Sequence, residues 1–125
     1  MAPIRIVAVD DEVLNNELLL RTFRGQTSYS LQVFVDIPKA LLHITQGEGA
    51  QILLLDQSMP EMSGTELAQE VVRRGFRPRI LLITAFPELK EVVSAWESGT
   101  IDGIVPKPWR AVDVLRAVER VAGRL

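Results

Sequence analysis

Charged and hydroxyl side chains follow several short apolar runs of the sequence, at the point where each run ends. These residues are Asp10, Asp11, Asp56, Thr84 and Lys107. Three carboxylates brought together repel one another unless a cation or a proton intervenes. A hard divalent ion with oxygen ligands, Mg²⁺ foremost, would resolve that repulsion. A lysine and a threonine hydroxyl opposite the carboxylates would then hold an anion on the metal.

The apolar runs are the expected strands that would bring these residues together. They are Ile4–Val9, Leu31–Val35, Ile52–Leu55, Ile80–Ile83 and Gly103–Val105. The third and fourth runs show no alternation of apolar and polar residues. Such runs are typical of strands inside a parallel sheet, where both faces are covered.

Apolar residues with helical spacing fill the stretches between the runs. The expected helices are one that ends before Gly25, one capped by Asp36, one over Gly64–Arg74, one over Pro87–Ser98 and one from about Arg110 onward. Alternating strands and helices with right-handed crossovers predict an α/β fold, a three-layer, doubly wound (βα)5. For its five-stranded parallel sheet we take the flavodoxin-like strand order 2-1-3-4-5. In that order the first and third strands are neighbours, so the three carboxylates converge in one crevice at the carboxyl edge of the sheet.

Each of these residues also has a plain structural interpretation. Asp11 would serve as the cap of the first helix, Lys107 as a solvated edge lysine, and Thr84 as an ordinary residue at a strand end. Taken singly, these interpretations are favoured. Taken together, five polar residues at neighbouring strand ends are hard to explain by capping alone.

The helical stripes predict which apolar residues face the core. For the first helix they are Leu14, Leu18, Leu19 and Phe23, and for the fourth they are Leu89, Val92, Val93 and Trp96. The last helix carries more apolar residues than one inward face requires. We expect Val112, Leu115, Val118 and Ala122 inside. We assign the surplus at Val114, Val121 and Leu125 to a partner surface, with a chain end that simply lies over the sheet as the alternative. Trp109 either joins that surface or packs under the helix.

Composition bounds the class of protein. The 125 residues are the size of one domain, with 47% hydrophobic and 24% charged residues, which argues against disorder. There is no Cys and a single His, His43, so thiolate and His-based sites are not expected. A net charge of −2 gives no attraction to nucleic acid or to an anionic membrane, and we read the arginines at 73, 74, 77 and 79 as a solvated edge. With no leader or membrane-spanning run in the sequence, we expect a cytoplasmic protein without nucleic-acid or membrane partners.

Four motifs resemble the receiver domain of two-component response regulators. They are VDDE at 9–12, LLLDQSMPEMSGTEL at 53–67, ITA at 83–85 and PKPW at 106–109. The resemblance covers the whole chain, in order and at the right spacing, so we expect one receiver domain over residues 1–125. The KPW ending and the WESG spacing resemble receivers of multidomain regulators, which leaves excision from a longer regulator open.

The resemblance implies a role for each site residue. Asp56 would be the phosphoacceptor that attacks a phosphohistidine. Asp11, Asp56 and the carbonyl of Ser58 would bind Mg²⁺ or Mn²⁺ directly, with Asp10 acting through a water. Lys107, the Thr84 hydroxyl and the Ala85 N–H would take the phosphoryl oxygens. Gly64 would permit an unusual backbone, and the Lys107-Pro108 peptide would be cis.

The resemblance also implies partners and a switch. The phosphodonor would be a sensor histidine kinase or a phosphotransfer protein. The surface of the fourth helix, fifth strand and fifth helix would face an output domain, a protein partner or a second copy of the chain. Family members usually carry Tyr or Phe three residues before the lysine, whereas this sequence has Ile104, so we expect switching without an aromatic flip.

Three other functions remain as alternatives. A phosphatase of the haloacid-dehalogenase type would need a second aspartate where Ser58 stands. A flavodoxin-like cofactor binder would need a Gly/Ser/Thr-rich loop in place of Asp10-Asp11. A receiver-like docking module that never takes phosphate would have been indicated by loss of an acidic residue or the lysine, and none is lost. The leading expectation is a self-phosphorylating and self-dephosphorylating switch with no separate substrate.

Overall fold

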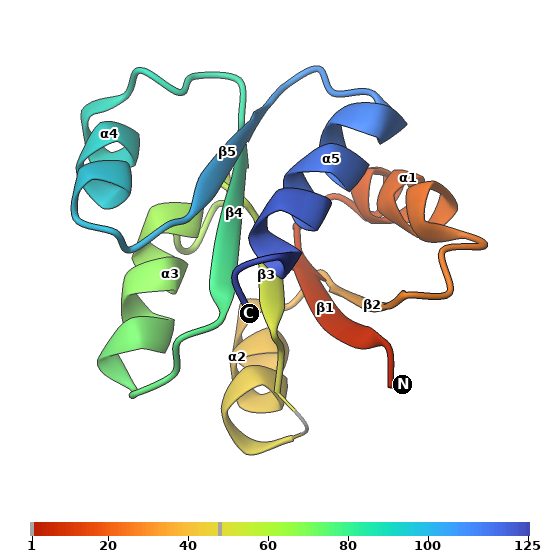
Figure 1. The fold of residues 1–125 in the computed structure, drawn as a ribbon. Helices are drawn as coiled ribbons and strands as arrows, with labels where there is room; N and C mark the ends of the chain where they lie inside the picture. Colours follow the sequence, from red (N-terminus) through yellow and green to blue (C-terminus); the bar gives the residue numbers. More distant parts are fainter. Residues whose placement is uncertain (1, 48) are drawn as a thin grey trace.

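The computed structural model describes residues 2–47 and 49–125, and over these ranges strands and helices alternate along the chain (Figure 1). The strands are β1 (Ile4–Val9), β2 (Tyr29–Phe34), β3 (Ile52–Asp56), β4 (Arg79–Thr84) and β5 (Gly103–Pro106). The helices are α1 (Val13–Phe23), α2 (Ile37–Gln46), α3 (Gly64–Arg73), α4 (Lys90–Glu97) and α5 (Ala111–Ala122).

All strand pairs are parallel, and the strand order is β2-β1-β3-β4-β5, which confirms the predicted fold class. β2 begins at Tyr29, earlier than predicted, because Tyr29 lies opposite Ile4 in the register of β1. Val9 lies opposite Leu55, and Leu55 lies opposite Leu82. The central strands therefore end together at one edge of the sheet.

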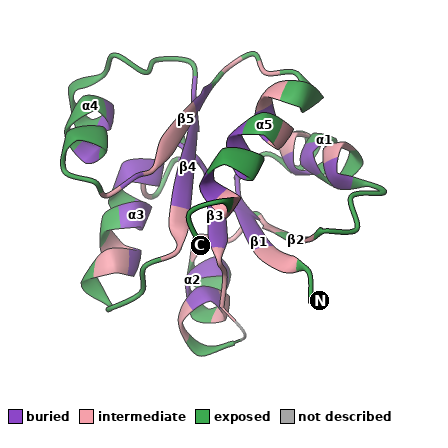
Figure 2. Ribbon diagram, viewed as in Figure 1, coloured by how far each residue is buried: buried purple, intermediate pink, exposed green. Residues whose placement is uncertain are grey.

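The sheet separates two apolar layers. On one face, residues of α2, α3 and α4 pack on Val7, Leu53 and Leu82; on the other, residues of α1 and α5 pack on Ala8 and Leu54. All five residues of β3 are buried, and buried residues run along the strands in Figure 2. Each unalternating strand is thus covered on both faces, as its sequence predicts.

Two helices begin as their sequences predict. The Asp36 carboxylate accepts a hydrogen bond from the Lys39 N–H at 3.1 Å and caps α2. Ser63 and Glu66 form a reciprocal capping box at the start of α3. These caps fix where the loops after β2 and β3 end.

The predicted inner face of α1 is wrong at Leu14 and Leu18 and correct at Leu19 and Phe23. Leu14 is 65% exposed and Leu18 is also exposed, whereas Asn16, Leu19 and Phe23 are buried. Hydrogen bonds explain this orientation of α1, since the Asn16 side chain donates to the backbone oxygens of Asp10 and Phe34 at 3.0 and 3.2 Å. These bonds rotate α1 so that Leu14 and Leu18 face outward.

The predicted inner faces of α4 and α5 also need correction. On α4, Val92 and Ala95 are buried, but Leu89, Val93 and Trp96 are exposed, Trp96 by 51%. α4 is short and lies near the edge of the sheet, so it is covered on a narrow face only (Figure 1).

On α5 the core takes the residues assigned to a partner surface. Val114 and Val121 are buried together with Ala117 and Val118, at i, i+3, i+4 and i+7 spacing, while Val112 is exposed. Apolar residues on two faces give two stripes of helical spacing. The predicted stripe is correct in part, because Val118 is buried and Leu115 and Ala122 are partly buried against the core. Leu125 is exposed as expected.

Within the described ranges, no helix has the length and apolar character needed to cross a membrane.

Candidate functional site

The predicted site residues gather at the carboxyl edge of the sheet. Asp10 directly follows β1, Asp56 ends β3, Thr84 ends β4 and Lys107 follows β5. One carboxylate oxygen from each of Asp10, Asp11 and Asp56 lies within 4.8 Å of the others, with Asp10 and Asp56 buried and Asp11 exposed. The structure therefore brings the three predicted carboxylates together.

Asp10 is held by the start of α1. Its Oδ1 accepts from the Glu12 N–H at 2.9 Å, and its Oδ2 accepts from Asn15 Nδ2 at 3.1 Å. Asn16 fixes its backbone oxygen, as described above. The sequence analysis did not predict a role for Asn15 and Asn16. The feature that could have indicated one is this polar pair within an otherwise apolar helical stretch.

Asp11 does not cap α1. The N-cap position is Glu12, and no side chain caps the helix. The structural alternative for Asp11 is therefore wrong. Its exposed carboxylate lies beside Asp10 and Asp56 instead.

Lys107 lies across the crevice from the acidic residues. Its ammonium forms an ion pair with Asp56 Oδ1, and its side chain is 30% exposed. The Lys107 backbone N–H donates to the Thr84 oxygen at 2.9 Å, and the Lys107-Pro108 peptide is cis, as the resemblance implies. Lys107 is thus tied to both β3 and β4 rather than being a free edge lysine.

Burial makes negative charge unfavourable in this crevice. It raises the pKa of Asp10, with the charge of Asp56 adding to the rise and the Glu12 N–H opposing it. It also raises the pKa of Asp56 against the opposing effect of Lys107. One lysine does not fully compensate the carboxylates, so the donor set suits a further cation with a preference for oxygen ligands.

Thr84 and Ala85 form the wall next to Lys107. The Thr84 hydroxyl is buried and accepts from the Phe86 N–H at 3.0 Å, which leaves its hydrogen available to donate. Ala85 and Lys107 both line a groove of about 760 Å³ that continues past Trp109 to α1. Trp109 is half-buried against the core beneath α5 and also lines this groove.

The loop after β3 carries Ser58 and returns to the strand at Gly64. A Cβ on Gly64 would lie 2.6 Å from the backbone carbonyl oxygen of Asp56 and 2.7 Å from Leu82 Cδ1. Gly64 does not have a positive φ. Glycine is required here by close packing, not by the unusual backbone that was expected.

Ile104 stands on β5 next to α4. It is partly buried and packs against the core cluster that includes Val92 and Ala95. A branched aliphatic side chain therefore stands three residues before Lys107, where family members usually carry Tyr or Phe.

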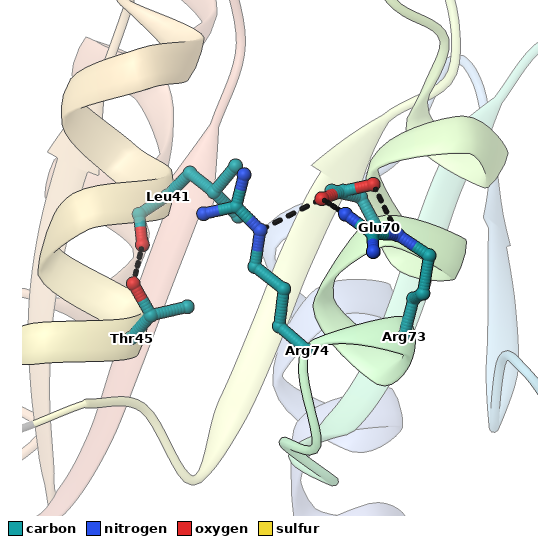
Figure 3. A network of polar contacts seen from close by, with 5 residues as sticks. All are labelled: Leu41, Thr45, Glu70, Arg73 and Arg74. Atoms are coloured by element: carbon teal, nitrogen blue, oxygen red, sulfur yellow. Dashed lines mark hydrogen bonds and ion pairs between the residues drawn. The ribbon is translucent and has the colours of Figure 1, made fainter.

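The arginines noted in the sequence lie away from the crevice and are largely paired. Glu70 lies between Arg73 and Arg74, with distances of 2.5 and 2.7 Å to their nitrogens (Figure 3). Figure 3 also shows the neighbouring helix α2, where the Thr45 hydroxyl donates to the Leu41 oxygen. Arg79 pairs with Asp102 at 3.0 Å.

Comparison with known proteins gives one family. The family model "Response regulator receiver domain" matches residues 6–119. The regulatory protein VanRc of Enterococcus gallinarum is 30% identical over 115 residues, 92% of this chain and 48% of VanRc. The response regulator MprA of Mycobacterium leprae is 30% identical over 122 residues, 96% of this chain and 51% of MprA. The chain thus spans about half the length of these relatives.

Solved structures agree on the fold. The chemotaxis protein CheY4 of Vibrio cholerae superposes with a TM-score of 0.83 at 22% identity, covering 96% of this chain and 99% of CheY4. The receiver domain of a sensor histidine kinase from Pseudomonas aeruginosa, with a magnesium ion in its active-site cleft, gives 0.81 at 20% identity, covering 98% and 99%. The family model covers most of this chain, and the strand order and fold agree with it. The chain therefore belongs to the response regulator receiver domain family.

Proposed function

We propose that the chain is a phosphoacceptor receiver domain in which phosphoryl transfer to Asp56 depends on Mg²⁺ or Mn²⁺. The observation that carries the proposal is the cluster of Asp10, Asp11 and Asp56 within 4.8 Å, with Lys107 paired to Asp56. The donor would be a phosphohistidine of a sensor histidine kinase or a phosphotransfer protein. In the transfer, an oxygen of Asp56 bonds to phosphorus, the P–N bond breaks, and the imidazole nitrogen leaves with the electron pair.

The metal ligands would be Asp11, Asp56 and the Ser58 carbonyl, with Asp10 acting through a water. A bound divalent ion supplies charge neutralisation for the phosphoryl oxygens. The raised pKa of Asp10 and of Asp56 supports a cation at this place, because burial leaves their charge poorly compensated.

The chain's own residues would do the positioning. The Lys107 ammonium moves from Asp56 to a phosphoryl oxygen, and the Thr84 hydroxyl and the Ala85 N–H donate to others. Thr84 ends β4, the strand beside β3, and Lys107 follows β5, so phosphorylation on β3 would pull on the ends of both β4 and β5.

The switched surface would be α4-β5-α5, facing an output domain, a protein partner or a second copy. The exposed Leu89 at the N-cap of α4, with Val93 and Trp96 on the helix, supports this choice, because an exposed apolar stripe favours contact with a partner. A second candidate function is docking without phosphorylation, for which the same stripe would serve.

Labelling by acetyl phosphate in the presence of Mg²⁺ tests the proposal. We expect a mass gain of one phosphoryl group in the wild-type chain and none in Asp56→Asn. Asp102→Asn, at the opposite edge of the sheet, is the matched control and should label normally. A wild-type chain that takes no label would favour the docking function, and full label on Asp56→Asn would refute the assignment of Asp56.

A further inference from the structure

A buried carboxamide lies directly beside the proposed phosphoacceptor. Gln57 follows Asp56, is 5% exposed, and turns its side chain toward the start of α3. Its Oε1 accepts from the Thr65 N–H at 2.9 Å, and its Nε2 donates to Thr65 Oγ1 at 3.2 Å. The Ser63 and Thr65 hydroxyl oxygens are 3.1 Å apart and extend this network.

The same residue is bonded through its backbone on both sides. The Gln57 N–H donates to the Ile83 oxygen at 3.0 Å, and the Gln57 oxygen accepts from the Gly64 N–H at 3.2 Å. Three hydrogen bonds therefore join Gln57 to Gly64 and Thr65. They close the loop 58–63 at its base, and the missing Cβ of Gly64 allows that close approach.

The loop closed in this way begins with Ser58, which is exposed while Gln57 before it is buried. A carbonyl in a loop is a useful metal ligand only if its direction is fixed before the ion arrives, since otherwise ion binding must order the loop. The buried hydrogen bonds between Gln57 and Thr65 order the loop 58–63, although neither residue is itself a proposed metal ligand.

We propose that the Gln57–Thr65 pair is a positioning device that sets the Ser58 carbonyl, and with it the affinity of the site for Mg²⁺. This inference rests on the proposed function. Neither residue touches the ion or the phosphoryl group in this scheme; both act through the loop.

Two substitutions of similar volume remove side-chain hydrogen bonds between the two residues. Gln57→Met removes both of its hydrogen bonds to Thr65, while Ser63 remains beside the Thr65 hydroxyl. Thr65→Val removes the hydroxyl, while Thr65→Ser keeps it and is the conservative rescue. Ile44→Val is the matched control. Ile44 is a buried core residue on α2, and with Arg5 and Pro78 it lines a cavity away from the crevice.

The experiment measures the Mg²⁺ dissociation constant, the rate of acetyl-phosphate labelling and amide exchange in the loop 58–63 for each folded variant. We expect Gln57→Met to weaken Mg²⁺ binding on the order of tenfold, as loss of an outer-shell partner does. Labelling should slow and loop exchange should quicken in parallel. Thr65→Val should follow in the same direction, with Thr65→Ser and Ile44→Val close to wild type.

The outcomes separate this inference from the function beneath it. A wild-type chain that binds Mg²⁺, with Gln57→Met or Thr65→Val binding it equally well, overturns the inference and leaves the proposed function standing. Equal losses in Thr65→Ser and Thr65→Val, or in Ile44→Val, also overturn it, because the effect would then be general destabilisation. A wild-type chain that binds no Mg²⁺ overturns both. If Gln57→Met does not fold, the Thr65 variants decide.

Discussion

The ammonium of Lys107 is paired with the carboxylate of Asp56, a side chain only 3% exposed. The pair joins the end of β3 to the segment between β5 and α5. A group on Asp56 that draws the ammonium away from the carboxylate would therefore also shift that segment. Under the proposed function, Lys107 would link the crevice to the α4-β5-α5 surface.

Lys107→Ala should accept some phosphate but fail to transmit the change. The carboxylates remain to bind Mg²⁺, whereas the connection from β3 to the start of α5 is lost. The measurement is the change in backbone NMR shifts of α4 and α5 on adding beryllofluoride, a phosphoryl mimic. Lys39→Ala, an exposed lysine on α2, is the charge control. Shift changes in Lys107→Ala as large as those of wild type would refute the role.

Asp11→Ala should lose Mg²⁺ binding and gain stability without metal. Losing a direct ligand should cost more than about tenfold in affinity, because outer-shell partners alone cost that much. Removing a unit charge roughly 4 Å from its neighbours in water-like surroundings should stabilise the apo protein on the order of 1 kcal/mol. Calorimetric titration and urea unfolding test the two parts. Unchanged Mg²⁺ affinity would show that the crevice is not a metal site.

Beryllofluoride should alter hydrogen exchange over residues 84–125. The proposed bonds to Thr84 and Lys107 act on the ends of β4 and β5, and a population shift needs only a few kcal/mol between two arrangements. Ile104 excludes an aromatic flip, so protection should change in the loop after Thr84 and along α4. Sedimentation in parallel reports self-association. If protection and association both stay constant, the responsive face must lie elsewhere, with the exposed side of α1 as the next candidate.

Glu70 gives a prediction about acid stability. Hydrogen bonds from Arg73 and then Arg74 lower the pKa of this carboxyl from 4.5 to about 2. A lowered folded-state pKa stabilises the folded protein above pH 4.5, and the stabilisation is lost as pH falls toward 2. The unfolding free-energy difference between wild type and Glu70→Gln should therefore shrink over that range. A carboxyl NMR titration measures the pKa directly, and in Arg73→Ala it should move back toward 4.5. High salt should reduce the shift, because the pair is exposed.

The sequence predicts most of this fold because two of its central strands, β3 and β4, carry unbroken apolar runs, whereas β2 begins earlier than predicted. Runs such as Ile52–Leu55 are apolar throughout and fit only a doubly covered strand, and the turn and cap residues around them agree. The crevice follows from strand order, since parallel strands end together. This is why Asp10, Asp56, Thr84 and Lys107 were predictable as neighbours.

Helix orientation was less predictable where apolar residues occupy more than one face. Leu14 and Leu18 fit the α1 stripe by spacing, but two hydrogen bonds from Asn16 decide which side of the helix is buried. On α5, apolar residues occupy two faces, and the core takes Val114 while Val112 is exposed. Periodicity identifies a helix, whereas its rotation depends on partners contributed by distant parts of the chain.

The outermost position of β5 limits how other chains can attach to the sheet. This edge strand has four residues and ends at Pro106, which has no N–H to offer. An incoming strand would find too few backbone donors and acceptors to extend the sheet. Assemblies built on this side should therefore be held by side chains of α4 and α5, and the protein should resist edge-to-edge aggregation there even at high concentration.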